Sequence, residues 1–185
     1  MGGLHVDPMN HSVWCATDPA RRTLGDCALG RAGKIARTVH GTRTRSARSE
    51  RPVLRGQGEI YVTDTDGNKV YGFDRKPHRF ASLELSRAMF YPNGITLTDD
   101  GKVLYVADFL GVQRMDLRSN EAEEVKPAAY DTLAGADGLY WYKDTLVGIQ
   151  NSASLRRVMR WQLSGDGRSM VASRSAGARD RRHPE

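Results

Sequence analysis

The four residues Tyr61-Val62-Thr63-Asp64 recur as Tyr105-Val106-Ala107-Asp108 about 44 positions later, and Val147-Gly148-Ile149-Gln150 follows after about 42 more. Each copy follows a turn that contains glycine and precedes a second run of alternating apolar residues. A period of about 40–50 residues built from short strands is typical of a β-propeller, in which each repeat forms one four-stranded blade. The repeat therefore predicts that any functional residues lie at the mouth of a central channel.

The second copy shows most clearly how one repeat is built. Alternating apolar and polar residues run over Gly94–Thr98, Val103–Asp108 and Val112–Leu117, with turn residues between the runs. Short runs of β-forming residues separated by such turns predict an antiparallel meander. We predict the same arrangement for Gly58–Asp74 and Gly138–Leu163. No window combines a period of about 3.6 residues with helix caps, so little helix is expected.

The length of the chain limits how much of a ring it can form. The 185 residues hold a partial copy at 1–20 and three clear copies within 56–165, whereas propellers have about four to eight blades. We therefore expect an all-β fold, a partial β-propeller of about three to four blades. An open ring leaves edge strands unpaired, which promotes association.

Two segments carry most of the positive charge. The net charge is +6, but the arginines gather at 21–55 and in the tail at 166–185, while the copies themselves are slightly acidic. No aromatic residue occurs between Trp14 and Tyr61, and neither segment has a strand period. This composition predicts an irregular Arg-rich segment at 21–55 and a disordered tail at 166–185.

Three interpretations of these basic segments stay open. An arm that binds nucleic acid would use the arginines, but no aromatics alternate with them to stack bases, so no nucleic-acid partner is expected. A solvated linker needs only the composition itself. Translation out of frame would explain why an Arg-Ser-Ala-Gly composition begins abruptly inside one copy and again after Leu163.

Several common site patterns do not occur in the sequence. Cys15 and Cys27 have neither zinc-ribbon spacing nor a disulfide framework, and the five histidines form no spaced cluster. Gly33-Lys34 lacks the spacing of a phosphate-binding loop. No N-terminal signal pattern and no long apolar run is visible, so we expect a soluble chain, cytoplasmic by default, without a membrane partner.

Two residues at matched places in the repeat are the strongest site candidates. Asn93 lies in Tyr91-Pro92-Asn93-Gly94, and Asp137, about 44 residues later, opens the third copy in Ala136-Asp137-Gly138-Leu139. The rotation of a propeller would bring both to the same end of the channel, where two side-chain oxygens can serve a hard divalent cation. A metal-bound carboxylate can also act as a general base. The alternative is that each residue only forms a turn.

Other polar residues end the second run of each copy. These are Asp64, Asp108 and the pair Gln150-Asn151. They could line the mouth or cap strand ends, and for Asp64 and Asp108 we predict the structural role, because the aspartate belongs to the repeat itself.

The second and third copies resemble a known family. The run from Tyr91 to Asp108 resembles the signature blade of the senescence marker protein/gluconolactonase/luciferin-regenerating enzyme family, and Asp137-Gly138-Leu139 with Val158-Met159-Arg160-Trp161 resembles its following blade. The resemblance covers roughly residues 3–18 and 56–165. It implies a six-bladed β-propeller that binds one divalent metal, expected to be Ca²⁺ with Zn²⁺ or Mg²⁺ as alternatives, and hydrolyses a small-molecule lactone or sugar-acid substrate.

The family's ligand pattern is only partly present. Its Pro-Asn-Gly asparagine, a metal ligand, falls on Asn93, and its Asp-Gly aspartate, a ligand and general base, falls on Asp137. A family glutamate has no counterpart, since the chain begins at what resembles the second blade, and Arg51–Gly56 replaces an Asn-Asp pair. The resemblance thus implies a metal-dependent lactone hydrolase, gluconolactonase-like but impaired. The alternative is a non-catalytic propeller scaffold or an inactive fragment.

Overall fold

The fold is built from β-strands alone within the part of the chain that the structure describes. The structure is a computed structural model, and it describes residues 4–6, 13–16, 23–29, 35–43, 49–55, 59–74, 79–151 and 156–175. Side chains are described for 59–73, 80–151 and 156–175. No helix able to cross a bilayer occurs among these residues.

The strands form four sheets of four strands each. The first sheet contains β1 (Leu4–Val6), β2 (Val13–Ala16), β3 (Thr23–Leu29) and β4 (Ile35–Arg43). The second contains β5 (Ser49–Arg55), β6 (Glu59–Asp64), β7 (Lys69–Asp74) and β8 (Arg79–Ser82). The third contains β9 (Ile95–Leu97), β10 (Val103–Ala107), β11 (Val112–Asp116) and β12 (Ala122–Glu124). The fourth contains β13 (Ala136–Tyr142), β14 (Thr145–Gln150), β15 (Arg157–Leu163) and β16 (Met170–Ser175).

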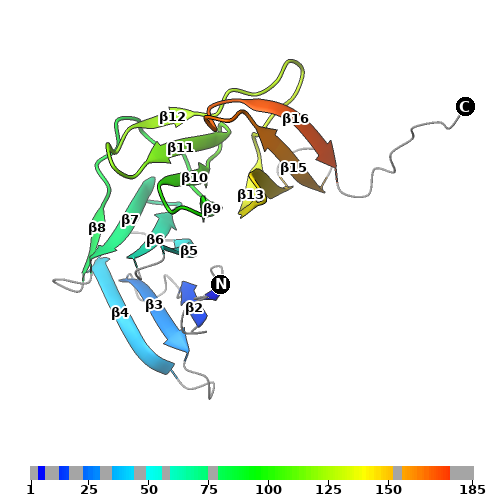
Figure 1. Cartoon of the computed structure of the whole chain (residues 1–185). Helices are drawn as coiled ribbons and strands as arrows, with labels where there is room; N and C mark the ends of the chain where they lie inside the picture. The colour runs from blue at the N-terminus through cyan, green and yellow to red at the C-terminus, as the bar shows by residue number, and fades with distance from the viewer. Residues whose placement is uncertain are drawn as a thin grey trace, which may run out of the picture.

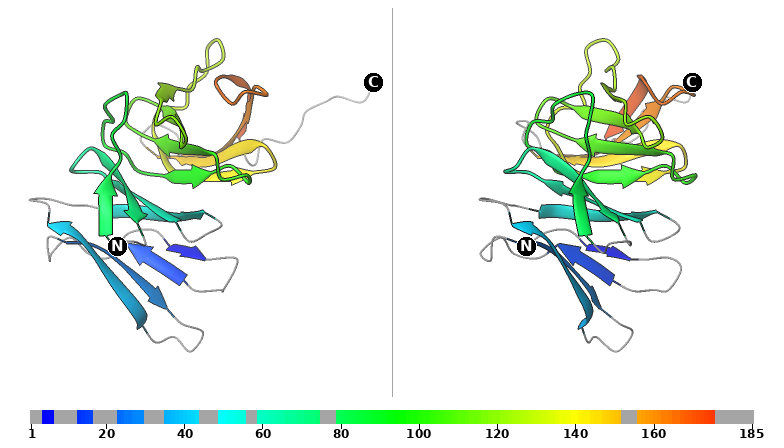
Figure 2. Two further views of the ribbon diagram at one scale, coloured as in Figure 1. Left: turned by 60° about the vertical axis from the view of Figure 1, so that its left-hand side comes forward. Right: turned by 90° about the vertical axis from the view of Figure 1, so that its left-hand side faces the viewer.

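Each sheet is an antiparallel meander, because every strand pairs with the next one along the chain. The four sheets follow one another along a curved path, from the blue first sheet to the orange end of the fourth (Figure 1). The rotated views in Figure 2 show the sheets stacked in chain order along this path. The first strands of successive sheets contact one another: β1 contacts β5, β5 contacts β9, and β9 contacts β13. This is the predicted all-β partial propeller.

The structure differs from the sequence prediction in the basic segments. Strands β3, β4 and β5 lie within 21–55, which we predicted to be irregular, and β16 lies within the predicted tail at 166–185. Those parts of the prediction are wrong. The physical reason is that backbone hydrogen bonds to β2, β6 and β15 hold these strands in place without aromatic side chains or a clean alternation. Residues 176–185 lie outside the described part of the chain.

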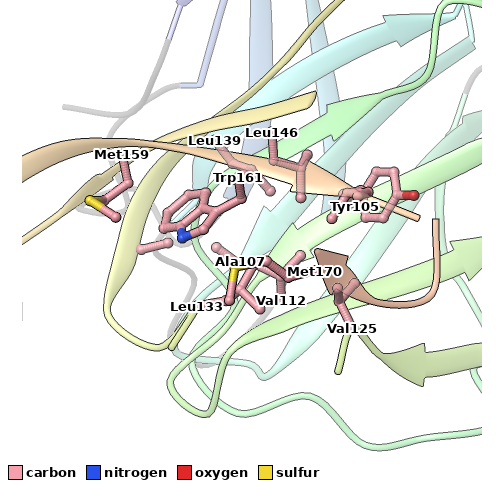
Figure 3. Packing of buried hydrophobic residues seen from close by; sticks show 12 residues of the cluster. Tyr105, Ala107, Val112, Val125, Leu133, Leu139, Leu146, Met159, Trp161 and Met170 are labelled. Carbon is pink, nitrogen blue, oxygen red and sulfur yellow. The ribbon is translucent and has the colours of Figure 1, made fainter. Parts of the chain in front are cut away.

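A continuous core joins the third and fourth sheets. Trp161, Leu139 and Leu146 come from the fourth sheet and pack against Tyr105 and neighbouring residues of the third (Figure 3). Burying one such side chain fully stabilises the fold by roughly 1.5–3 kcal/mol. The contact between the sheets therefore fixes the relative positions of their first strands.

A glycine makes room for the largest side chain of this core. A Cβ placed on Gly148 would lie 2.5 Å from Cζ3 of Trp161, which is fully buried. Tyr105 stacks on the indole of Trp141 with ring centroids 5.5 Å apart, and its hydroxyl donates to the carbonyl of Gly167 at 3.1 Å. Burial raises the pKa of Tyr105. The tyrosine of the repeated motif is thus a core residue.

Candidate functional site

Asn93 stands just before β9, at the end of the sheet where β10 finishes. Its backbone N–H donates to the carbonyl of Ala107 at 2.8 Å, and the N–H of Ala107 donates to the carbonyl of Gly94 at 2.7 Å. These bonds continue the antiparallel ladder beyond the Ile95–Val106 pair. Because Asn93 and Gly94 both bond to Ala107, the pairing is irregular here, and these backbone bonds to the end of β10 set the position of Asn93.

The structure brings the two predicted motifs into direct backbone contact. A Cβ placed on Gly94 would lie 2.4 Å from the carbonyl oxygen of Asp137 and 2.6 Å from the nitrogen of Leu139. Only glycine permits this approach, because no real Cβ tolerates such distances. Asn93 and Asp137 consequently begin neighbouring first strands at the same end of the sheets.

Asp137 has a polar partner just beyond the end of the adjoining strand β14. The amide Nδ2 of Asn151 donates to Oδ2 of Asp137, and the backbone N–H of Asn151 donates to the carbonyl of Gly135 at 3.1 Å. Both Asn93 and Asp137 are half-buried, whereas Asn151 is exposed. The start of β13 therefore brings the carboxylate of Asp137 against the amide of Asn151, with Asn93 just before the neighbouring strand β9.

Hydrogen bonds from the second sheet fix the backbone around Asn93. The hydroxyl of Thr63 donates to the carbonyl of Asn93 at 2.7 Å, and the hydroxyl of Thr65 donates to the carbonyl of Pro92 at 2.7 Å. On the other side, the N–H of Trp141 donates to the hydroxyl of Thr96 at 2.9 Å and links β13 to β9. Adjacent sheets are thus connected at the first strands.

The repeated aspartates have the structural role that the sequence predicted. Oδ1 of Asp108 accepts from the N–H groups of Leu110 and Gly111, both at 3.0 Å, and Oδ2 accepts from the side-chain amide of Gln113 at 3.2 Å. Asp108 is only 3% exposed. Its carboxylate therefore closes the turn after β10 and does not reach the mouth.

Asp64 and Gln150 end the equivalent strands in the neighbouring sheets. Oδ1 of Asp64 accepts from the N–H of Gly67 at 2.9 Å, and burial together with the charge of Asp64 raises the pKa of Tyr71. Gln150 donates to the carbonyls of Thr132 at 3.2 Å and Ala134 at 2.9 Å. Gln150 thus fastens the loop before β13, so of the Gln150-Asn151 pair only Asn151 contacts a site candidate.

The register of the second sheet identifies a further position that sequence reasoning missed. Pro52 pairs with Val62 in the second sheet, as Ile95 pairs with Val106 in the third and Leu139 with Gly148 in the fourth. Counting two residues back from Pro52, Ile95 and Leu139 gives Glu50, Asn93 and Asp137.

The local irregularity of the strands supports this equivalence. The register shifts between Ser49 and Pro52 in β5, and it shifts at the corresponding place between Ala136 and Leu139 in β13. Glu50 precedes Asn93 by about 43 residues. This spacing matches the repeat length, so it is the sequence signal that identifies Glu50 as the equivalent position. The sequence prediction treats 21–55 as irregular and compares only Arg51–Gly56 with the family's ligand pattern.

The described side chains do not form a carboxylate-rich metal centre. Within residues 59–73, 80–151 and 156–175, no group of three or more His, Cys, Asp or Glu residues could hold a metal ion. Asn93, Asp137 and Asn151 offer only oxygen as potential metal-binding atoms, which suits a hard cation, with one negative charge among them. The roles of Asn93 as a ligand and Asp137 as a ligand and base stay predictions.

Comparison with known proteins supports the fold but not a family. No protein-family model matches the chain, and no curated protein matches it. Among solved structures, virginiamycin B lyase from Staphylococcus aureus is similar with a TM-score of 0.67 and 18% identity, over 93% of this chain and 53% of that one. Kuenenia stuttgartiensis hydrazine synthase gives a TM-score of 0.69 and 17% identity, over 93% and 48%.

A third similar structure is a set of WD40 repeats. The WD40 repeats of RRP9 give a TM-score of 0.64 at 10% identity, over 93% of this chain and 49% of that one. The chain therefore spans about half the length of the solved structures that it matches. At these identities the similarity establishes the propeller-like fold alone, which hosts many unrelated functions.

Proposed function

We propose that the chain carries a weak divalent-cation site at the mouth formed by β9 and β13, and that it belongs to a propeller acting on small cyclic esters. Asn93 and Asp137 are the ligands in this proposal, and Asp137 is also the general base. The single observation that supports it most is the backbone contact of Gly94 with Asp137 and Leu139, which sets two oxygen-bearing residues on neighbouring first strands.

The donor set favours Ca²⁺ over the other divalent metals. Asn93 and Asp137 supply oxygen, and Asn151 adds an amide beside the carboxylate. Ca²⁺ accepts six to eight oxygen ligands in flexible geometry, while Zn²⁺ prefers nitrogen and sulfur and Mg²⁺ needs near-octahedral order. Glu50 at the equivalent position of β5 is the third protein ligand that we propose, because it would add the missing negative charge.

The chain's own residues would orient the substrate and move one proton. When bound, a hard cation would polarise the carbonyl of a lactone. Asp137 would remove a proton from the attacking water through the carboxylate oxygen that Asn151 does not occupy. Since one oxygen of Asp137 already accepts a hydrogen bond from Asn151, only the other oxygen is open to the attacking water. We therefore propose that hydrolysis by this chain is slow.

A binding propeller without chemistry is the second candidate. The observation that favours it is the same Asp137–Asn151 hydrogen bond, which satisfies the only carboxylate that the described side chains bring to this mouth. In that case the pair is a structural link between β13 and the end of β14. The two candidates differ in whether Asp137 affects cation affinity and turnover.

Lactone hydrolysis with and without added calcium tests the proposal. We expect slow opening of γ-butyrolactone or glucono-lactone that depends on Ca²⁺, and Asp137→Asn should lower the rate at least tenfold by removing the base. Asp99→Asn is the matched control, an exposed carboxylate in the turn after β9. Glu50→Gln should weaken calcium binding severalfold. Turnover that ignores calcium, or that survives Asp137→Asn unchanged, would rule the proposal out.

A further inference from the structure

Four large apolar side chains stand exposed beside the candidate site. Tyr91 is 59% exposed and Phe109 is 69% exposed, and Phe90 and Leu110 are close to half exposed at 48% and 47%. Large apolar side chains that gather on a surface commonly mark a binding site. We call these four residues the apolar rim.

The apolar rim belongs to the same end of the third sheet as Asn93. Phe90 and Tyr91 come directly before Pro92-Asn93, and Phe109 and Leu110 come directly after Asp108. The N–H of Phe109 donates to the carbonyl of Phe90 at 2.8 Å, which extends the pairing of the two segments beyond β9 and β10. The rim is therefore continuous with the backbone that positions Asn93.

The rim is held in place by polar contacts rather than by burial of its side chains. The N–H of Tyr91 donates to Oδ1 of Asn68 at 2.7 Å, and Thr65 donates to the carbonyl of Pro92 at 2.7 Å. The rings of Tyr91 and Phe109 meet edge to face with centroids 6.5 Å apart. Because this aromatic pair is already held in place, its side chains would lose little conformational entropy when a ligand contacts them.

The backbone of Tyr91 is strained. Its φ is +50°, a value that is unusual for a bulky residue, and the following proline further disfavours a helical-type conformation. Such strain persists where the surrounding structure enforces it, and it concentrates at functional sites. The exposed Tyr130 also has a positive φ, so the strain shows how this segment is held, and the binding role rests on the exposure and position of the rim.

We infer that the apolar rim binds the hydrophobic part of the substrate, so that the preferred substrates are cyclic esters with an alkyl or aryl substituent rather than unsubstituted or sugar-derived lactones. This inference rests on the proposed function, because the reacting ester would lie at Asn93 and Asp137. The substituent would then extend from the mouth across Tyr91 and Phe109.

Binding of lactams tests the inference without any turnover. γ-Butyrolactam and γ-decalactam resemble the two corresponding lactones, but they are not readily hydrolysed. We expect calorimetry to give at least tenfold tighter binding of γ-decalactam, and Phe109→Ser should remove most of that preference, while Phe109→Leu should keep it. Tyr130→Ser is the matched control, because Tyr130 is fully exposed outside the rim and also has a positive φ.

The outcomes separate this inference from the proposed function. Equal affinity for the two lactams, or a preference that survives Phe109→Ser, overturns the inference whether or not lactones are hydrolysed. A preference that depends on Phe109 without hydrolysis of γ-decalactone supports the apolar site and overturns the proposed reaction. If Phe109→Ser instead converts a dimer into a monomer in size-exclusion chromatography with light scattering, the rim is an interface between copies and the inference is wrong.

Discussion

Asp108 and Asp137 lie at the same end of neighbouring sheets, yet their surroundings differ completely. Asp108 ends a second strand, is 3% exposed and receives three hydrogen bonds from its own turn and from Gln113. Asp137 begins a first strand, is half-buried and has one side-chain partner, Asn151, among the described residues. The comparison shows that the role of a carboxylate depends on its position within the repeat. A carboxylate at the end of a second strand is structural, whereas one at the start of a first strand can still accept a ligand.

Gly94→Ala should have the largest effect, because it breaks the contact that brings the two first strands together. The new methyl group would meet the backbone of Asp137 and Leu139 at 2.4 and 2.6 Å, and backbone cannot move aside as a side chain can. We expect a loss of about 3 kcal/mol in the free energy of unfolding, at the upper end for overpacking. Urea denaturation measures it.

Gly165→Ala is the matched control for that variant. A Cβ at Gly165 would have nothing within 4 Å, so the change should stay within about 0.5 kcal/mol, as for most surface substitutions. If the two alanine variants are equally stable, the close approach of β9 and β13 does not exist in solution.

Asp108→Ala should have the next largest effect. It leaves the N–H groups of Leu110 and Gly111 without their acceptor and deprives Gln113 of a partner, and each buried polar group left unpaired costs about 1–3 kcal/mol. We expect a loss of about 2 kcal/mol by urea denaturation. Asp137→Ala should cost less than about 1 kcal/mol, because its side chain makes one exposed hydrogen bond. The reverse order would refute the division of roles between the two aspartates.

Much of the fold could be predicted from the sequence where alternation and turns coincide. The runs around Tyr61 and Tyr105 pair as expected, and the tyrosine and valine of the motif enter the core in both sheets. The adjacency of Asn93 and Asp137 could also be predicted, since a constant repeat length places equivalent residues at one end of the ring. The strands between Thr23 and Arg55 could not, because backbone pairing imposed by neighbouring strands does not require a characteristic composition.

The remaining features of the site depend on local geometry that spacing does not encode. No pattern in the sequence predicts that Asn151 donates to Asp137, because the contact depends on where β14 ends opposite the irregular start of β13. The apolar rim could not be predicted from the sequence, because the exposure of its side chains and the positive φ of Tyr91 follow from the path of the chain between β8 and β9. Glu50 was not predicted as a site residue, because the strand that contains it, β5, lies in a segment that the composition predicts to be irregular.

Calcium titration calorimetry of the wild type, Asn93→Ala, Asp137→Ala and the double variant tests the central claim most directly. We predict that the wild type binds one Ca²⁺ with a Kd of about 10⁻⁴–10⁻³ M, the weak end for protein sites with few carboxylates. Each single variant should weaken binding at least tenfold, and the double variant should be no worse than the weaker single variant, because ligands of one ion are strongly coupled. Undetectable binding by the wild type at millimolar calcium, or an unchanged Kd in either single variant, would contradict a shared cation site at Asn93 and Asp137.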